Sequence, residues 1–189
     1  MPATRAIQTS YGDCRFRSRA EARWAVFFDR LDVPWDYEPE GFELPSGRYL
    51  PDFFLPATKG GTYFEVKGQK PDDAELTKAR ELCAASGKRV LIAVRAPLAP
   101  DGMSAFAESM VAFLPGPHRT DSGEMIVSED WDYWWCECAR CGAVGVEHTG
   151  RSARLGCFCY DPSDDKQFNY MSDRLMAAYA AARSARFGT

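Results

Sequence analysis

Four apolar residues near the start of the chain follow the i, i+3, i+4, i+7 spacing of an amphipathic helix: Trp24, Phe27, Phe28 and Leu31. This spacing predicts a helix from about Ser18 to Leu31. Val33 precedes Pro34, and the residue before a proline avoids the helical conformation. We therefore expect the helix to end just before this dipeptide.

Glu21 lies one turn before Trp24, at the edge of the apolar face of this helix. One interpretation is structural, because Ser18 followed three residues later by Glu21 fits a capping box. The other is functional, because a carboxylate at this position could reach acidic side chains on a neighbouring sheet. The sequence leaves both interpretations open, and the two can coexist.

Two short runs rich in aromatic and β-branched residues follow the helix, and a loop at 56–61 with one proline and two glycines separates them. This pattern predicts two antiparallel strands, preceded by a short strand at 35–37. With the loop at these residues, Leu55 pairs with Thr62. The register of the hairpin is thereby predicted as well.

Asp52 and Glu65 fall directly opposite each other in this register. Opposed side chains have Cβ atoms about 4.5–5.5 Å apart, and like charges there destabilise a sheet. A divalent cation would reverse the penalty, because it binds carboxylate oxygens. Lys67 lies on the same face. The alternatives are a solvated face with an ordinary Glu–Lys pair, and a register shifted by one residue, which would separate the carboxylates.

A second helix and a buried strand are predicted after this hairpin. The helix is expected from Pro71 to about Ser86, with Gly87 as its C-terminal stop. The continuous apolar run Val90–Val94 predicts a strand that is buried on both faces. The order of strand, helix and strand predicts a crossover that returns the chain to the same sheet.

The second half of the chain shows weaker periodicity. Residues 95–130 are punctuated by prolines and glycines, and 104–114 could form a helix or a strand. His118 is expected in a surface loop. An alanine-rich pattern predicts a last helix from Met171 to Phe187.

Length and composition indicate a globular protein of one domain with a small appendage. The chain has 189 residues, of which 46% are hydrophobic and 26% charged. It has no apolar run of about 18 residues, as a transmembrane helix requires, and its start lacks the apolar segment of a secretory signal. We therefore expect a cytoplasmic protein with no membrane partner.

The charge of the chain argues against broad electrostatic binding of nucleic acid, since the net charge is -4. The distribution is uneven, however. Residues 1–31 contain six arginines against three acidic residues, and the last 24 residues are also basic. A local phosphate-binding face at the two ends of the chain is compatible with this pattern.

Five of the seven cysteines lie between residues 136 and 159, which favours a metal site over disulfides in a chain without an export signal. A CxxC pair and a CxC pair, joined by a predicted hairpin of 144–148 with 154–158, suit a tetrahedral structural zinc site. Its predicted ligands are Cys138, Cys141, Cys157 and Cys159. Cys136 could replace Cys138, and His148 is another candidate ligand. An iron–sulfur cluster is a further alternative.

These patterns together divide the chain into three parts. Residues 1–130 are expected to form an α/β (α+β) core with a mixed sheet flanked by helices. Residues 131–165 are expected to form a zinc-ribbon module. The helix in 166–189 is expected to pack on the core or on the ribbon.

The acidic hairpin resembles a known nuclease motif. Asp52, preceded by proline, is followed thirteen residues later by Glu65-Val66-Lys67, which is similar to the PD-(D/E)XK motif. The helix that carries Glu21 also matches the order of elements in that superfamily. The resemblance covers about residues 15–95, and it implies a restriction-endonuclease-like fold. With the ribbon behind it, the chain is similar to small nucleases of phages and prophages, which implies a bacterial host cell.

The resemblance implies a Mg²⁺- or Mn²⁺-dependent endodeoxyribonuclease. Asp52 and Glu65, with the carbonyl of Val66, would hold the ion. Lys67 would position the attacking water or stabilise the developing charge, and Glu21 would complete the cluster. In some members of the superfamily one acidic residue of the site lies at a different position in the sequence, so another acid could take the role of Glu21. The candidates for that role are Glu38 and Glu40. Gln69, on the same strand face as Lys67, could contact substrate or solvent.

DNA is the partner implied by this resemblance, and the chain could act as a homodimer. Structured or branched DNA is one option, and simple duplex DNA is another. The competing hypothesis is a non-catalytic nucleic-acid-binding protein that uses its zinc ribbon on a decayed nuclease fold. That hypothesis predicts a missing acid or lysine. All four motif residues are present, namely Glu21, Asp52, Glu65 and Lys67. The enzyme is therefore the preferred hypothesis.

Overall fold

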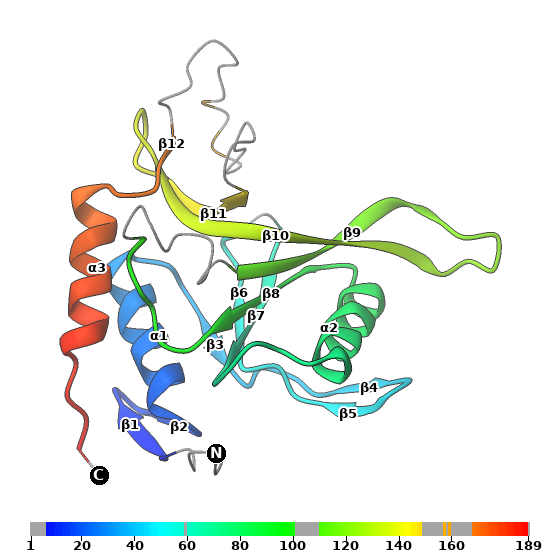
Figure 1. Ribbon diagram of the computed structural model, residues 1–189, viewed down its shortest axis with the longest axis horizontal. Helices are drawn as coiled ribbons and strands as arrows, with labels where there is room; N and C mark the ends of the chain where they lie inside the picture. The colour runs from blue at the N-terminus through cyan, green and yellow to red at the C-terminus, as the bar shows by residue number, and fades with distance from the viewer. Residues whose placement is uncertain are drawn as a thin grey trace.

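A curled mixed sheet forms the centre of the protein in a computed structural model, which describes residues 7–58, 60–100, 110–148, 157, 159 and 168–188 (Figure 1). The strands of this sheet are β3 (Asp36–Tyr37), β6 (Phe53–Leu55), β7 (Thr62–Lys67), β8 (Arg89–Val94), β9 (Met110–Arg119), β10 (Met125–Cys138), β11 (Val144–His148) and β12 (Phe168–Asn169). Their order is β11-β10-β9-β8-β7-β6-β3, and β12 pairs with β10. With three helices among the described residues, the fold is of the mixed α+β class, as predicted.

One helix connects a parallel pair of neighbouring strands in the sheet. Strands β7 and β8 are parallel, and α2 (Asp73–Ser86) joins them on one face. Asp72 caps the start of α2 in a capping box with Glu75, and Gly87 ends it with a left-handed φ of 65°. The predicted helix, buried strand and crossover are all confirmed.

The other two helices pack together on the opposite face of the sheet (Figure 1). Helix α1 (Arg19–Arg30) lies beside α3 (Asp173–Ser184), and the rings of Phe27 and Tyr179 are 4.7 Å apart. The ring of Phe28 packs on that of Phe64 of β7 at 5.3 Å. The helical spacing of the first third of the chain is thus confirmed. The last predicted helix is also confirmed, over a shorter range than 171–187.

The register of the β6–β7 hairpin agrees with the prediction. Leu55 pairs with Thr62, and Phe53 pairs with Phe64. Asp52, one residue before β6, is therefore aligned with Glu65 in β7. Two smaller antiparallel pairs were not predicted: β1 (Thr9–Tyr11) with β2 (Cys14–Phe16), and β4 (Phe42–Leu44) with β5 (Gly47–Tyr49).

The weakly patterned segment contains the long hairpin of β9 and β10, which projects beyond α2 (Figure 1). His118 is exposed as expected, but the expected loop is wrong, because this residue lies within β9. Pro115 and Pro117 fit there because β9 pairs with β8 only up to Phe113, and a proline is tolerated on an unpaired edge. Of the 104–114 segment, the described residues 110–114 are strand.

Strand β10 also bears on the predicted organisation of the chain. It runs through residues 130 and 131, the predicted boundary of the zinc module, and pairs with both β9 and β11. The division into three parts stays a prediction. Among the described residues, no helix is long and apolar enough to cross a membrane.

Candidate functional site

A pair of carboxylates lies in the sheet where β6 begins and β7 ends. Asp52 and Glu65 are 6% and 1% exposed. The backbone N–H of Asp52 donates to Glu65 Oε1 at 3.3 Å, and the N–H of Val66 donates to Asp52 Oδ2 at 2.8 Å. The sheet backbone therefore fixes both side chains. As predicted from the alternation of faces, Lys67 lies beside them.

The electrostatics of this pair are unfavourable. Burial and the neighbouring charge of Glu65 raise the pKa of Asp52 from 3.8 to about 8, although the Val66 N–H and Lys67 act in the opposite direction. The cations beside the two carboxylates thus only partly offset their charge, and the pKa of Asp52 stays well above its ordinary value. Two fixed carboxylates whose charges are only partly offset are a donor set that suits a divalent cation.

Lys67 and Tyr49 complete the immediate surroundings of Glu65. Lys67 Nζ lies 3.4 Å from Glu65 Oε2 and 3.9 Å from a carboxylate oxygen of Glu75. The Tyr49 ring lies 5.9 Å from Lys67 Nζ, and the negative charge of Glu65 acts on the Tyr49 hydroxyl. Burial, together with Glu65, holds the pKa of Tyr49 far above its ordinary value. Tyr49 comes from the β4–β5 hairpin, which the sequence did not predict.

Glu21 is used in a hydrogen-bond network of its own. Ser18 is the N-cap of α1, as predicted, and its hydroxyl accepts the Glu21 N–H at 3.2 Å and donates to the Glu21 carboxylate at 2.7 Å. The carboxylate also accepts the hydroxyl of Tyr37 at 2.6 Å and the backbone N–H of Arg17 at 3.1 Å. The predicted N-cap is therefore confirmed, but among the hydrogen bonds of the described residues the Glu21 carboxylate accepts the Ser18 hydroxyl and not the Ser18 backbone N–H that a capping box requires.

Arg17 connects this network to the carboxylate pair. Its Nη2 lies 2.7 Å from Asp52 Oδ1, and its Nε lies 2.8 Å from Glu38 Oε1. Arg17 was not predicted as a site residue, because its partner Asp52 is 35 residues away in the sequence. Of the other candidates, Glu40 accepts a hydrogen bond from Tyr63 at 2.6 Å, and Gln69 is exposed.

The second candidate site is the cysteine cluster, which consists of Cys138, Cys141, Cys157 and Cys159. Their sulfur atoms all lie within 4.8 Å of one another. In the described part of the chain, this is the one group found with three or more potential ligands so close together. A tetrahedral zinc ion with Zn–S bonds of about 2.3 Å would place sulfurs about 3.8 Å apart. The four thiols can therefore bind a metal such as zinc after a small adjustment.

A tight turn after β10 brings the first two cysteines together. The Gly142 N–H donates to the Cys138 carbonyl at 2.8 Å, and the Cys138 N–H donates to the Ala143 carbonyl at 2.8 Å. Gly142 has a φ of 71°, which favours glycine. Arg174 of α3 donates to the carbonyls of Gly142 and Leu31 at 3.1 and 2.7 Å, so it ties the turn to the end of α1.

Hydrogen bonds within the cluster prepare one thiol for metal binding. Burial raises the pKa of Cys138, but donation from the backbone N–H groups of Cys141 and Arg140 and from neighbouring thiols outweighs it and brings the pKa to about 7. The hydrogen bond with Cys141 raises the pKa of Cys159 to about 12. Since the thiolate is the form that binds metal, Cys138 is the ligand most ready to do so.

The alternative ligands lie outside this group of four. Cys136 is completely buried in β10. His148 in β11 has its Nε2 3.7 Å from Asp130 Oδ1. The predicted strand at 154–158 lies outside the described residues except for Cys157, and β11 pairs with β10.

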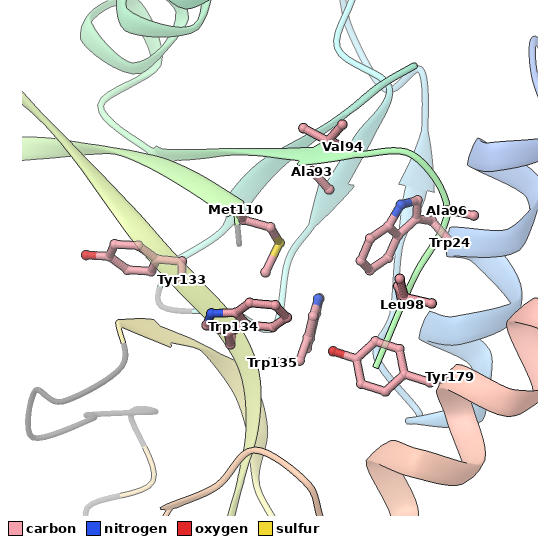
Figure 2. Close-up of a pocket in the computed structure, with 10 residues that line it drawn as sticks. All are labelled: Trp24, Ala93, Val94, Ala96, Leu98, Met110, Tyr133, Trp134, Trp135 and Tyr179. Atoms are coloured by element: carbon pink, nitrogen blue, oxygen red, sulfur yellow. The ribbon is translucent and has the colours of Figure 1, made fainter. Parts of the chain in front are cut away.

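A third feature is a small aromatic cavity between α1, β8, β10 and α3. Figure 2 shows Trp24, Trp135 and Tyr179 around it. Its volume of about 20 Å³ leaves room for one water molecule. The Nε1 of Trp135 is buried and has no hydrogen-bond partner among the residues that the structure describes. The cavity is thus too small for a nucleobase and is no candidate for substrate binding.

Comparison of this chain with protein-family models, curated proteins and solved structures finds no match. The interpretation of both sites therefore depends on their residues and geometry.

Proposed function

We propose that the protein is a nuclease of the PD-(D/E)XK type that hydrolyses phosphodiester bonds in DNA with Mg²⁺ or Mn²⁺. The observation that carries the proposal is the buried pair of Asp52 and Glu65 with Lys67 beside it. Two adjacent buried carboxylates weaken a fold, and strongly shifted pKa values of this kind concentrate at functional sites. The order of α1, the β6–β7 hairpin, the α2 crossover and β8 supports a restriction-endonuclease-like core.

The donor set fits a hard divalent cation. Asp52 and Glu65 would supply carboxylate oxygens, and the Val66 carbonyl would supply a third ligand. When bound, Mg²⁺ would polarise a phosphoryl oxygen and lower the pKa of a water molecule. Because Asp52 would have to release its proton first, binding should strengthen as the pH rises towards 8.

Two side chains would position the reacting groups. The Lys67 ammonium, held 3.4 Å from Glu65, would orient a water or stabilise negative charge that develops on phosphate. The Tyr49 hydroxyl, on which the charge of Glu65 acts, would orient this carboxylate for metal binding. Glu21 would act indirectly, by holding the backbone of Arg17 beside Asp52.

A metal-titrated cleavage assay tests this proposal. Purified protein should cleave DNA with Mg²⁺ or Mn²⁺ and not with EDTA, and linear, forked, four-way and single-stranded substrates would define the substrate class. Asp52→Asn and Lys67→Met should each reduce the rate at least about 100-fold while the far-UV circular dichroism is unchanged. Glu43→Gln is the matched control, because this exposed carboxylate pairs only with Arg48 among the contacts of the described chain. Unchanged cleavage in the Asp52 and Lys67 variants would refute the site.

We further propose that the cysteine cluster holds one structural Zn²⁺. The four thiols would fill all tetrahedral positions, which leaves no place for substrate. The ion would fix the turn after β10, which Arg174 connects to α1. Its role would therefore be to stabilise the end of the sheet.

A further inference from the structure

Arg17 lies at the solvent side of the carboxylate pair and has no assigned role in the PD-(D/E)XK motif as it stands in this chain. Its side chain is 49% exposed, whereas that of Asp52 is 9% exposed. Its backbone is held firmly, because its N–H donates both to Glu21 at 3.1 Å and to the Tyr37 hydroxyl at 3.0 Å. A half-exposed guanidinium is thus anchored through its backbone beside a buried carboxylate.

The two oxygens of Asp52 have donors of different kinds. Oδ2 accepts the backbone N–H of Val66 at 2.8 Å, and Oδ1 accepts Arg17 Nη2 at 2.7 Å. The Val66 N–H belongs to a central strand and cannot turn away without disrupting the sheet. The Arg17 side chain has rotatable bonds and is half exposed. Any cation that binds Oδ1 would therefore compete with Arg17.

A second acid keeps the guanidinium close once it leaves Asp52. Glu38 Oε1 lies 2.8 Å from Arg17 Nε. Glu38 has a φ of 48°, an uncommon value for a residue with a side chain, and its N–H donates to the Asp52 carbonyl at 2.9 Å. Because the Glu38 contact uses Nε, the two Nη groups would remain available. Two parallel N–H donors of a guanidinium match the oxygens of a phosphate.

We propose that Arg17 is a phosphate-binding residue that rests on Asp52 as a counter-ion and moves to a phosphate of DNA when a divalent cation takes Asp52. The proposal rests on the nuclease function above and specifies how metal and substrate binding are coupled. Each ligand favours the same displacement of Arg17, so metal and DNA bind cooperatively. Arg17 also keeps the metal affinity low until DNA is present.

The variant Arg17→Met separates the two halves of this role. It removes the charge and keeps most of the length of the side chain. The backbone N–H of residue 17 can still donate its hydrogen bond to the Glu21 carboxylate. Removal of a positive charge favours a doubly charged ion more than it favours a proton on Asp52. Mg²⁺ binding without DNA, measured by calorimetry at pH 8.5, should therefore tighten about tenfold. Binding of a DNA duplex in Ca²⁺, measured by fluorescence anisotropy, should weaken about tenfold.

Three further variants make the test specific. Arg17→Lys keeps the charge without the two-donor geometry, so its DNA affinity should fall while its Mg²⁺ affinity stays near that of the wild type. Arg17→Gln offers a second neutral variant if Arg17→Met does not fold. Arg48→Met is the control, because Arg48 is an exposed arginine that pairs with Glu43, and it should change neither affinity.

The outcomes distinguish this inference from the nuclease proposal. Opposite changes in metal and DNA affinity, with an unchanged circular dichroism spectrum, support the role of Arg17. Mg²⁺ affinity that is equal or weaker in the neutral variants, or unchanged DNA affinity, overturns it even where the wild type cleaves DNA. Absence of Mg²⁺ binding by the wild-type protein overturns the nuclease proposal and this inference with it.

Discussion

The buried carboxylate pair should make the protein less stable than a neutral variant of itself. Burial and Glu65 raise the pKa of Asp52 from 3.8 to about 8. A group whose pKa is raised by folding stabilises the protein below its unfolded pKa, and this contribution is lost as the pH rises through the folded pKa. Stability of the wild type should therefore fall between about pH 4 and pH 8, without added Mg²⁺.

Asp52→Asn removes this dependence. Each pH unit between about pH 4 and pH 8 changes the free energy of unfolding by up to about 1.4 kcal/mol. Relative to the wild type, the variant should therefore be more stable by at most about 2 kcal/mol at pH 5.5 and at most about 4 kcal/mol at pH 7. Asparagine can still accept the Val66 N–H. It loses the ion pair with Arg17, which is half exposed and worth at most about 1 kcal/mol. A net gain of about 2–3 kcal/mol at pH 7 is therefore expected.

Urea unfolding followed by circular dichroism measures the effect, in buffers without added divalent ions at pH 5.5, 7 and 8. The gain in the free energy of unfolding should increase with pH. Glu43→Gln, at an exposed ion pair, should show no such trend. A destabilised Asp52→Asn variant, or a gain that does not grow with pH, would refute the electrostatic account of the site.

Two further predictions concern the aromatic cavity and the cysteine cluster. Trp135→Phe should destabilise the protein less than Trp24→Phe, by about 1 kcal/mol in urea unfolding. In the described part of the chain Trp135 Nε1 has no hydrogen-bond partner, whereas Trp24 Nε1 donates to the Arg95 carbonyl at 2.8 Å. An equal loss of stability in the two variants would show that packing alone decides. Elemental analysis should find about one zinc per chain, and its removal by Cys141→Ser or a strong chelator should lower the Tm by about 5–10 °C. Absence of zinc, or the absorption spectrum of an iron–sulfur cluster, would contradict the zinc proposal.

The parts of the fold that the sequence predicted are those governed by local patterns. The helical spacing that includes Phe27 and Phe28 was enough to predict α1, because a single apolar stripe determines which face of a helix is buried. The loop at 56–61 fixed the β6–β7 register, because a strand shifted by one residue would turn Phe64 away from the core. The aligned carboxylates of Asp52 and Glu65 follow directly from that register.

The unpredicted parts depend on tertiary context. Prolines at 115 and 117 masked β9, and they are tolerated only because the outer part of that strand lacks a second neighbour. Strands of three residues, such as β4 and β5, are too short to show a period. The ion pair of Arg17 with Asp52 joins residues 35 positions apart. No periodicity in a single sequence records such a contact.

Glu21 illustrates how a local rule and a site can share one residue. The capping spacing with Ser18 was visible in the sequence, and the structure confirms the cap. The same carboxylate also holds Tyr37 and the backbone of Arg17. The helix cap requires only the contact between Ser18 and Glu21. The contacts of Glu21 with Tyr37 and with the Arg17 backbone connect the start of α1 to Asp52, and they account for a buried glutamate on the apolar edge of a helix.

The stiffness of the carboxylate pair decides where the site can adapt. Asp52 and Glu65 are fixed by backbone N–H groups of a sheet whose two faces both pack on hydrophobic clusters. Neither side chain can move without losing its hydrogen bond from the backbone. Adjustment to a ligand must therefore come from the side chains that reach the pair from outside the sheet core, which are Arg17 and Tyr49. Apart from its contact with Asp52, Arg17 is held through its backbone and Glu38, and Tyr49 is carried by a short separate hairpin. These two contacts, rather than the acidic pair, are where bound and free states of the site should differ.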